Sequence, residues 1–166
     1  MTGGSLTSKN GHRFHVTNTN AVITLFGVAL INEDASGVLL SVCSDGWSGG
    51  GNTATLMAAG QELFGAVLVG SDSDLTLELT DGSAFTGSIG GSITNASGTT
   101  VSTEIGTVAV MLSRNSIWSL TADSSISFFD GDAPCVITNA HALYANGIAL
   151  TGTKKRPVPV DLFHNR

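Results

Sequence analysis

The fold is decided by the stretch Leu75-Thr76-Leu77-Glu78-Leu79-Thr80-Asp81-Gly82-Ser83-Ala84-Phe85. Its leucines alternate with polar residues, so the leucines point to one side of an extended chain and the residues between them point to the other. A helix is excluded, because the segment lacks a 3.6-residue period and is interrupted by glycine. The stretch therefore predicts a short strand with one buried face and one wet face, followed by a turn.

The same frame recurs along the chain, which is typical of a repeat fold. Residues 55–64 align with residues 76–85 at an offset of 21, and residues 110–118 follow at an offset of 33 from that second copy. In a looser earlier copy, Leu25 precedes Leu56 at an offset of 31. The longer intervals contain stretches rich in Gly, Ser and Thr, which we interpret as loop insertions at one corner of the repeat.

A period near 22 residues with three short strands per turn predicts an all-β fold, a right-handed parallel β-helix (solenoid) of about 22-residue coils. In that fold Phe64, Phe85 and Trp118 are expected to stack as an internal aromatic ladder. The alternative is a β-sandwich, which also has short strands at regular spacing. A sandwich does not explain why residues 79–85 and 112–118 share one frame.

Composition limits the classes of partner. Of the 166 residues 42% are apolar and 12% are charged, and the net charge is −6. The apolar share is enough for a core, while the acidic balance gives no electrostatic attraction to phosphate backbones, so no nucleic acid partner is expected. No apolar run approaches the ~18 residues of a membrane helix, and no membrane insertion is expected either.

Composition also divides the chain into two parts. Residues 1–153 read as a single β-helix domain, expected to be a fragment of a longer exported protein, whereas residues 154–166 form a basic tail with two prolines that serves as a cap or linker. Solenoid ends are open edges, so a homo-oligomer formed through them is a further possibility. Cys43 and Cys135 lack the CxxC spacing of zinc and redox sites and are interpreted as buried or incidental thiols.

Several segments carry a family resemblance: Gly3-Gly4-Ser5-Leu6-Thr7-Ser8-Lys9-Asn10-Gly11, Val16-Thr17-Asn18-Thr19, Leu25-Phe26-Gly27-Val28, Leu79-Thr80-Asp81-Gly82-Ser83 and Leu143-Tyr144-Ala145-Asn146-Gly147. They resemble the pectin-lyase-like β-helix repeats in large surface proteins of gut and rumen bacteria, which are similar to adhesins and autotransporter passengers. The resemblance implies an extracellular or cell-surface location in contact with a polysaccharide or glycan. It names no reaction, and the adjacent Asp pair of many pectin-cleaving relatives is missing here.

Carboxylates are the candidate catalytic groups. If the repeats stack, their loop insertions fall at one corner and bring acidic side chains of successive coils together, with strands ~4.8 Å apart. The candidates are Asp45, Asp72, Asp74, Glu104, Asp130 and Asp132. Stacked carboxylates raise one another's pKa, so that one can act as the acid and another as the base of a glycoside hydrolase. Asp is also a common turn residue, and solvation of the corners is the simpler interpretation.

Two further residues are candidates for substrate binding. Trp47 offers a plane on which a sugar ring can stack, and Glu78 lies on the outward face of its strand, where it can join a polar binding surface. Outward threonines also suggest an ice-binding surface, but Met57 and Met111 interrupt the row.

Metal and esterase chemistry have weaker signals. Asp72-Ser73-Asp74 and Asp130-Gly131-Asp132 offer oxygen ligands for calcium, although neither matches a full calcium loop. The expectation is a site without a cofactor, with calcium as the alternative. A Ser-His-Asp triad lacks the strand-to-helix context of its nucleophile, and the neighbouring His12 and His15 are expected to be exposed surface residues.

These observations favour an extracellular glycan-binding or adhesin-like module. The alternative is a glycoside hydrolase, or less favourably a polysaccharide lyase, that uses paired carboxylates at the corner of the repeat.

Overall fold

The computed structural model describes residues 1–45, 52–95, 97–113 and 115–154. In these residues the chain forms twenty short strands and one 3₁₀ turn, Ala133–Cys135, and no α-helix. The prediction of an all-β protein is confirmed. The tail from residue 155 onward, for which a cap or linker is predicted, lies outside the described residues.

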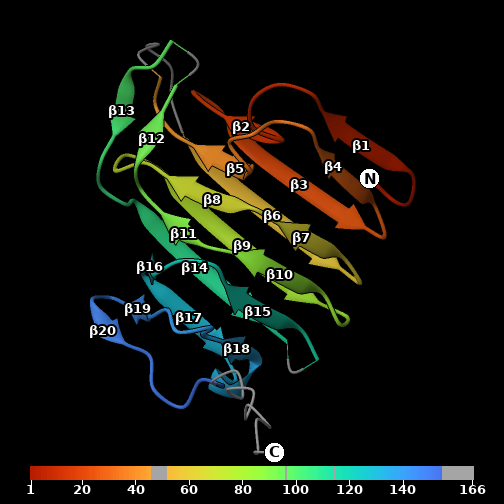
Figure 1. The fold of residues 1–166 in the computed structure, drawn as a ribbon, viewed down its shortest axis with the longest axis vertical. Helices are drawn as coiled ribbons and strands as arrows, with labels where there is room; N and C mark the ends of the chain where they lie inside the picture. The colour runs from red at the N-terminus through yellow and green to blue at the C-terminus, as the bar shows by residue number, and fades with distance from the viewer. Residues whose placement is uncertain (46–51, 96, 114, 155–166) are drawn as a thin grey trace, which may run out of the picture.

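Most strands belong to three parallel sheets, which cross the molecule in similar directions in Figure 1. Sheet I holds, in spatial order, β17 (Phe128–Gly131), β14 (Thr107–Leu112), β9 (Asp74–Thr80), β6 (Thr53–Ala59) and β3 (Asn20–Phe26). Sheet II holds β11 (Ile89–Gly90), β8 (Ala66–Val69), β5 (Val38–Val42) and β2 (Phe14–Val16). Sheet III holds β18 (Val136–Ile137), β15 (Ile117–Leu120), β10 (Ala84–Gly87) and β7 (Glu62–Phe64).

The remaining strands extend or interrupt this pattern. A parallel pair near the N-terminus consists of β1 (Ser5–Ser8) and β4 (Ala29–Asn32). An antiparallel hairpin of β12 (Ile93–Thr94) and β13 (Thr100–Ser102) is inserted between β11 and β14. Near the C-terminal end β19 (Leu143–Ala145) pairs with β16 (Ser124–Ile126) in parallel and with β20 (Ile148–Ala149) in antiparallel orientation.

The chain visits the three sheets in turn. From β5 to β10 it passes through sheets II, I, III, II, I and III, so hydrogen-bonded neighbours within a sheet are separated by two strands in sequence. Between sheets III and II the corner is sharp, because β7 runs into β8 through Gly65 alone. This glycine has a φ of +117°, and a Cβ there would clash with the Gly37 carbonyl oxygen. Only glycine fits a corner this close to a neighbouring backbone.

The register confirms two of the predicted offsets and corrects a third. Thr55 pairs with Thr76, an offset of 21, and Leu77 pairs with Val110, an offset of 33. The earlier copy has an offset of 33 instead of 31, because Leu56 pairs with Ile23. The shift is by two positions, so both alignments put the same face of β3 inward.

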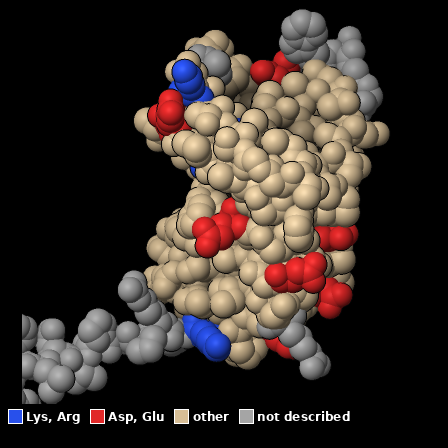
Figure 2. Space-filling model, turned by 90° about the vertical axis from the view of Figure 1, so that its right-hand side faces the viewer, with Lys and Arg blue, Asp and Glu red and all other residues tan. Residues whose placement is uncertain are grey.

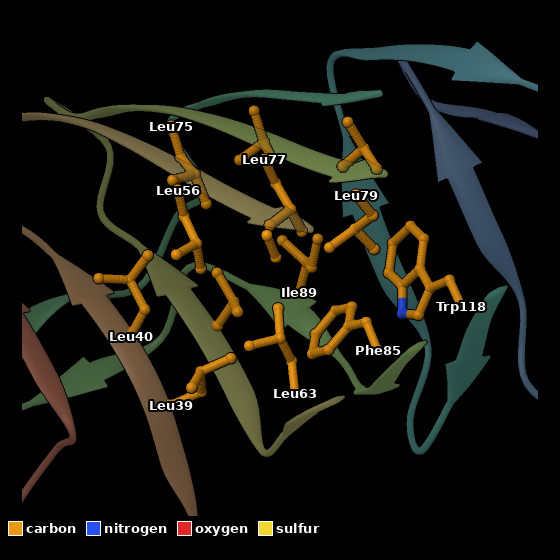
Figure 3. Close-up of a cluster of buried hydrophobic side chains, with 14 of the residues drawn as sticks. Leu39, Leu40, Leu56, Leu63, Leu75, Leu77, Leu79, Phe85, Ile89 and Trp118 are labelled. Carbon is orange, nitrogen blue, oxygen red and sulfur yellow. The ribbon is translucent and has the colours of Figure 1, made fainter. Parts of the chain in front are cut away.

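The core lies between the sheets and is filled by the inward side chains of these strands (Figure 3). In β9, Leu75, Leu77 and Leu79 are at most 2% exposed, as the alternation predicts. Each such leucine contributes roughly 1.5–3 kcal/mol through burial. Successive strands in register place these side chains in stacked rows along the sheet, so each strand shields the next.

Aromatic stacking is present, but it is shorter than predicted. Phe85 and Trp118 are stacked with ring centroids 5.6 Å apart, and the Trp118 indole N–H donates to the Gly87 carbonyl. The prediction that Phe64 continues the ladder is wrong, because Leu63 pairs with Phe85 and the Phe64 side chain is 47% exposed. Two residues separate β6 from β7 and three separate β9 from β10, and this one-residue difference turns Phe64 outward.

Gln61 connects two successive turns inside the core. Its side-chain oxygen accepts from the Val28 N–H at 2.8 Å, and its side-chain N–H donates to the Val28 carbonyl at 2.7 Å. Gln61 and Val28 are each 3% exposed. The amide thus satisfies both backbone groups of Val28 where regular strand pairing is interrupted.

Candidate functional site

Four of the predicted carboxylates lie at the corner between sheets II and I. Asp45 follows β5, Asp72 lies between β8 and β9, Asp74 begins β9, and Glu104 lies between β13 and β14. Asp72, Asp74 and Glu104 are exposed. The Asp45 carboxylate accepts a hydrogen bond at 3.1 Å from the side-chain amide of Asn95, not from another carboxyl group.

The remaining two carboxylates lie at a different corner, and the prediction of one acidic edge across four coils is wrong in this respect. Asp130 lies in β17 opposite Met111, whereas Asp74 lies opposite Thr107 in the same sheet. The pair Asp130–Met111 and the pair Asp74–Thr107 are four residues apart along the strands, or about 13 Å at ~3.3 Å per residue. Asp132 follows β17, where the chain leaves sheet I for sheet III. On the face drawn in Figure 2 the acidic side chains likewise form separate small groups.

Glu78 and Asp130 border a shallow groove on the outward face of sheet I. Both lie in register with Met111, one on each neighbouring strand. The groove has a volume of about 310 Å³ and is also lined by Thr80 and Ser113. The structure thus brings the predicted substrate-binding Glu78 together with one predicted catalytic residue, Asp130.

Two further predictions have a limited outcome. Trp47 lies outside the described residues. Among the described residues, no group of three or more His, Cys, Asp or Glu side chains is arranged to hold a metal ion, so neither predicted calcium segment gains support.

A larger cavity of about 620 Å³ lies over the outward face of sheet II, between the hairpin β12–β13 and the segments around residues 10–12 and 34–36. We call it the histidine pocket and define it by the following lining residues: His12, His15, Asp34, Asp45, Ile93 and Asn95. The histidine pocket contains one predicted catalytic carboxylate, Asp45, and its other lining residues were not predicted to lie together. Its size is in the range of small-molecule sites, roughly 300–1,000 Å³.

Ser41 anchors both histidines of this pocket. Its side-chain oxygen lies 2.7 Å from Nδ1 of His12 and 2.7 Å from Nδ1 of His15, and the serine is 0% exposed. The two imidazole rings are T-shaped with centroids 5.9 Å apart. His15 is exposed, as predicted, and His12 is only partly exposed, but the sequence did not indicate that both rings are fixed on one buried hydroxyl.

The sequence contained one signal of this arrangement. Ser41 is the polar residue in the otherwise apolar run Val38–Cys43. A buried hydroxyl needs a hydrogen-bonding partner, so such a serine indicates polar groups packed against its strand. Which groups these are depends on the parallel pairing of His15 with Ser41, two positions that are distant in sequence.

The electrostatics of the pocket favour a neutral His12. Burial lowers the pKa of His12 below its ordinary value, and the neighbouring His15 lowers it further, while Asp34 acts in the opposite direction. Hydrogen bonds from Ser36, first from its side chain, and from the Gly11 N–H lower the pKa of Asp34 to about 2. Burial raises the pKa of the Cys43 thiol, with a further contribution from Asp45. At neutral pH the pocket thus combines uncharged His12 with ionised Asp34.

Comparison with protein-family models, curated proteins and solved structures finds no match for this chain. The resemblance to pectin-lyase-like repeats therefore stays a prediction. In the described parts of the chain, no helix has the length and apolar character that a membrane crossing requires.

Proposed function

We propose that the chain is an extracellular, carbohydrate-associated module, built as a right-handed parallel β-helix, whose histidine pocket binds a neutral glycan. The solenoid is supported by three parallel sheets that the chain visits in turn, with paired strands at offsets of 21 and 33. The resemblance of its repeats to bacterial surface proteins supports the extracellular location.

The observation that carries the glycan assignment is the lining of the pocket. Amide, hydroxyl, carboxylate and imidazole groups surround a cavity that also contains the apolar side chains of Ile93 and Val101. Sugars present hydroxyl groups around apolar C–H faces, and a pocket of mixed donors, acceptors and small apolar patches complements both.

The charges in the pocket select among glycans. Asp34 and Asp45 both line the cavity, and the low pKa of Asp34 keeps that residue ionised. A uronate or sulfate group would be repelled by these carboxylates. We therefore assign the pocket to a neutral sugar.

Binding of a polysaccharide panel tests this function. Neutral xylan, mannan and galactan are compared with polygalacturonate by affinity electrophoresis and titration calorimetry. We expect binding to at least one neutral polymer, weakened about 10- to 100-fold by Asp45→Ala, the effect of losing about 1.4–2.8 kcal/mol of charge-assisted hydrogen bonding. Asp74→Ala is the matched control, because Asp74 lies at the same corner outside the pocket lining. Equal binding by both variants, or preference for polygalacturonate, contradicts the assignment.

A glycoside hydrolase is the second candidate function, favoured by the groove between Glu78 and Asp130. Their strands are separated by that of Met111, so their backbones are two strand spacings apart, or about 10 Å. Inverting glycosidases hold their two carboxyl groups ~6.5–9.5 Å apart. The same polysaccharide panel is assayed for new reducing ends. Glu78→Gln and Asp130→Asn should each abolish turnover. Glu62→Gln is the control, because Glu62 is exposed outside the groove, and it should keep turnover. Turnover that survives both substitutions excludes this groove as the active site.

Association through the ends of the molecule also stays a prediction. Strands β3 and β17 are the two outer strands of sheet I. Outer strands can pair with another chain unless they are covered.

A further inference from the structure

We propose that Ser41, His12 and His15 form a bifunctional acid–base site that interconverts the two anomers of a reducing neutral sugar. The identity of the ligand rests on the proposed function above. The chemical argument rests on the three side chains themselves.

A single serine proton links the two histidines. A hydroxyl has one proton to donate and two lone pairs to accept with, and a neutral imidazole carries its proton on one of two nitrogens. Because Ser41 Oγ lies 2.7 Å from both Nδ1 atoms, its proton points to one of them. The other Nδ1 must then carry its own proton and donate it to Ser41 Oγ. If both Nδ1 atoms donated, the buried serine proton would lose its partner, at a cost of about 1–3 kcal/mol.

The two rings are consequently held in complementary tautomers. The ring that accepts the serine proton has its own proton on Nε2, and the ring that donates to Ser41 has a free lone pair on Nε2. Both rings line the pocket, and among the described residues neither Nε2 atom has a recorded hydrogen-bond partner. When both rings are neutral, the pair offers one acid and one base to a bound molecule.

The spacing of the rings suits two oxygens of one sugar. The ring centroids are 5.9 Å apart, and the proposed reaction requires each Nε2 atom to form a hydrogen bond of about 2.8 Å with one of two neighbouring sugar oxygens. In the cyclic form of a reducing sugar, the anomeric hydroxyl oxygen and the ring oxygen are bonded to the same carbon.

Ring opening balances without any co-reactant. The basic Nε2 takes the proton of the anomeric hydroxyl, the bond between the anomeric carbon and the ring oxygen breaks, and a carbonyl forms. The ring oxygen takes its proton from Nε2 of the second histidine. The first histidine passes its Nδ1 proton to Ser41, and Ser41 passes its own proton to Nδ1 of the second histidine.

Both imidazoles are then neutral again, with their tautomers exchanged. Rotation about the bond next to the carbonyl and the reverse sequence close the ring as the other anomer. Closure also restores the original tautomers, so each cycle leaves the site ready for the next molecule. The low pKa of His12 supports this cycle, because a protonated ring would remove the base from the pair.

Polarimetry with freshly dissolved α-anomers of glucose, galactose, mannose and xylose measures the reaction. We expect the protein to accelerate anomer exchange of at least one of these sugars above the rate given by free imidazole at the same concentration. His12→Gln and His15→Gln should each lower the protein-dependent rate by about 10²-fold, the lower range of general acid–base catalysis. His141→Gln is the control, since His141 pairs with Asp123 outside the pocket and that variant should keep the full rate.

Ser41 is a positioning residue in this site, and its role needs a separate measurement. Ser41→Ala keeps both imidazoles, and Ser41→Cys serves as a second variant that retains a group of similar volume at this core position. We expect both to lose the rate. The ¹⁵N spectrum of the histidine side chains gives a readout independent of activity: the native protein should show one Nδ1–H and one Nε2–H tautomer, and Ser41→Ala should not maintain this pairing.

Several results would overturn the inference. These are a native rate equal to that of free imidazole, a rate unaffected by Ser41→Ala in a folded protein, or identical tautomers in the native pair. Methyl glycosides, which cannot open, separate this inference from the proposed function. If a neutral methyl glycoside binds but no free sugar is interconverted, the pocket is a binding site and the catalytic inference is wrong. If neither binds, both proposals fail.

Discussion

Replacing Gln61 by alanine is expected to destabilise the protein strongly, although Gln61 is polar and belongs to no strand. The substitution removes the side-chain groups that pair with the Val28 N–H at 2.8 Å and the Val28 carbonyl at 2.7 Å. Both residues are 3% exposed, so water has little access to the backbone groups that are left. An unsatisfied buried group costs about 1–3 kcal/mol, and two of them predict a loss of about 2–6 kcal/mol in the free energy of unfolding.

Urea unfolding followed by circular dichroism measures this loss. Glu62→Ala is the matched control, because Glu62 is the exposed neighbour and a surface change of this kind is usually within ~0.5 kcal/mol of neutral. Similar m-values for the three proteins are needed before their midpoints are compared. If Gln61→Ala is no less stable than Glu62→Ala, the side-chain amide does not substitute for strand pairing between these turns and the reasoning is wrong.

Two further outcomes follow from the core and from the histidine pocket. Trp118→Ala should lower the free energy of unfolding by about 3–5 kcal/mol, because Trp118 is fully buried and stacked on Phe85. The control Ile117→Ala, at a position 43% exposed, should lower it far less. Equal losses of the two variants in urea unfolding would contradict the internal stack. Acidification should reduce stability in two steps, because the folded-state pKa values of His12 and Asp34 are both lowered. The His12 contribution is present above its ordinary value of 6.5 and is lost as the pH falls below it, and the Asp34 contribution is lost as the pH falls from 3.8 toward about 2. In urea unfolding at a series of pH values, His12→Gln should flatten the first step, and His141→Gln should leave it unchanged. An unchanged first step in His12→Gln would contradict its assignment to His12.

The candidate site was only partly predictable. Asp45, Glu78 and Asp130 were expected at the surface and each lines a hollow there, because Asp and Glu in a β-rich chain are confined to turns and outward strand positions. Their grouping was not predictable: Asp130 joined Glu78 in a groove instead of Asp45 at a corner. The distribution of carboxylates over corners depends on the strand that each loop follows, and the acidic residues themselves carry no sign of it.

The sequence by itself determined the strands, their buried faces and the main repeat. Side-chain direction alternates with every residue of an extended chain, so Leu75, Leu77 and Leu79 identify an inward face without knowledge of any partner. The aligned copies likewise provided the offset that pairs Thr55 with Thr76.

Only the tertiary structure decided the features that depend on turn length and on contacts between distant residues. One residue fewer in the turn before β7 reverses Phe64, because a one-residue shift moves every side chain to the opposite face. The hydrogen bonds between Ser41 and the two histidines join positions that are far apart in sequence, and they exist because parallel pairing places β2 beside β5. The alternation of polar and apolar residues within one strand does not show which distant residues come into contact. Those contacts are decided by how the strands pair in the folded chain.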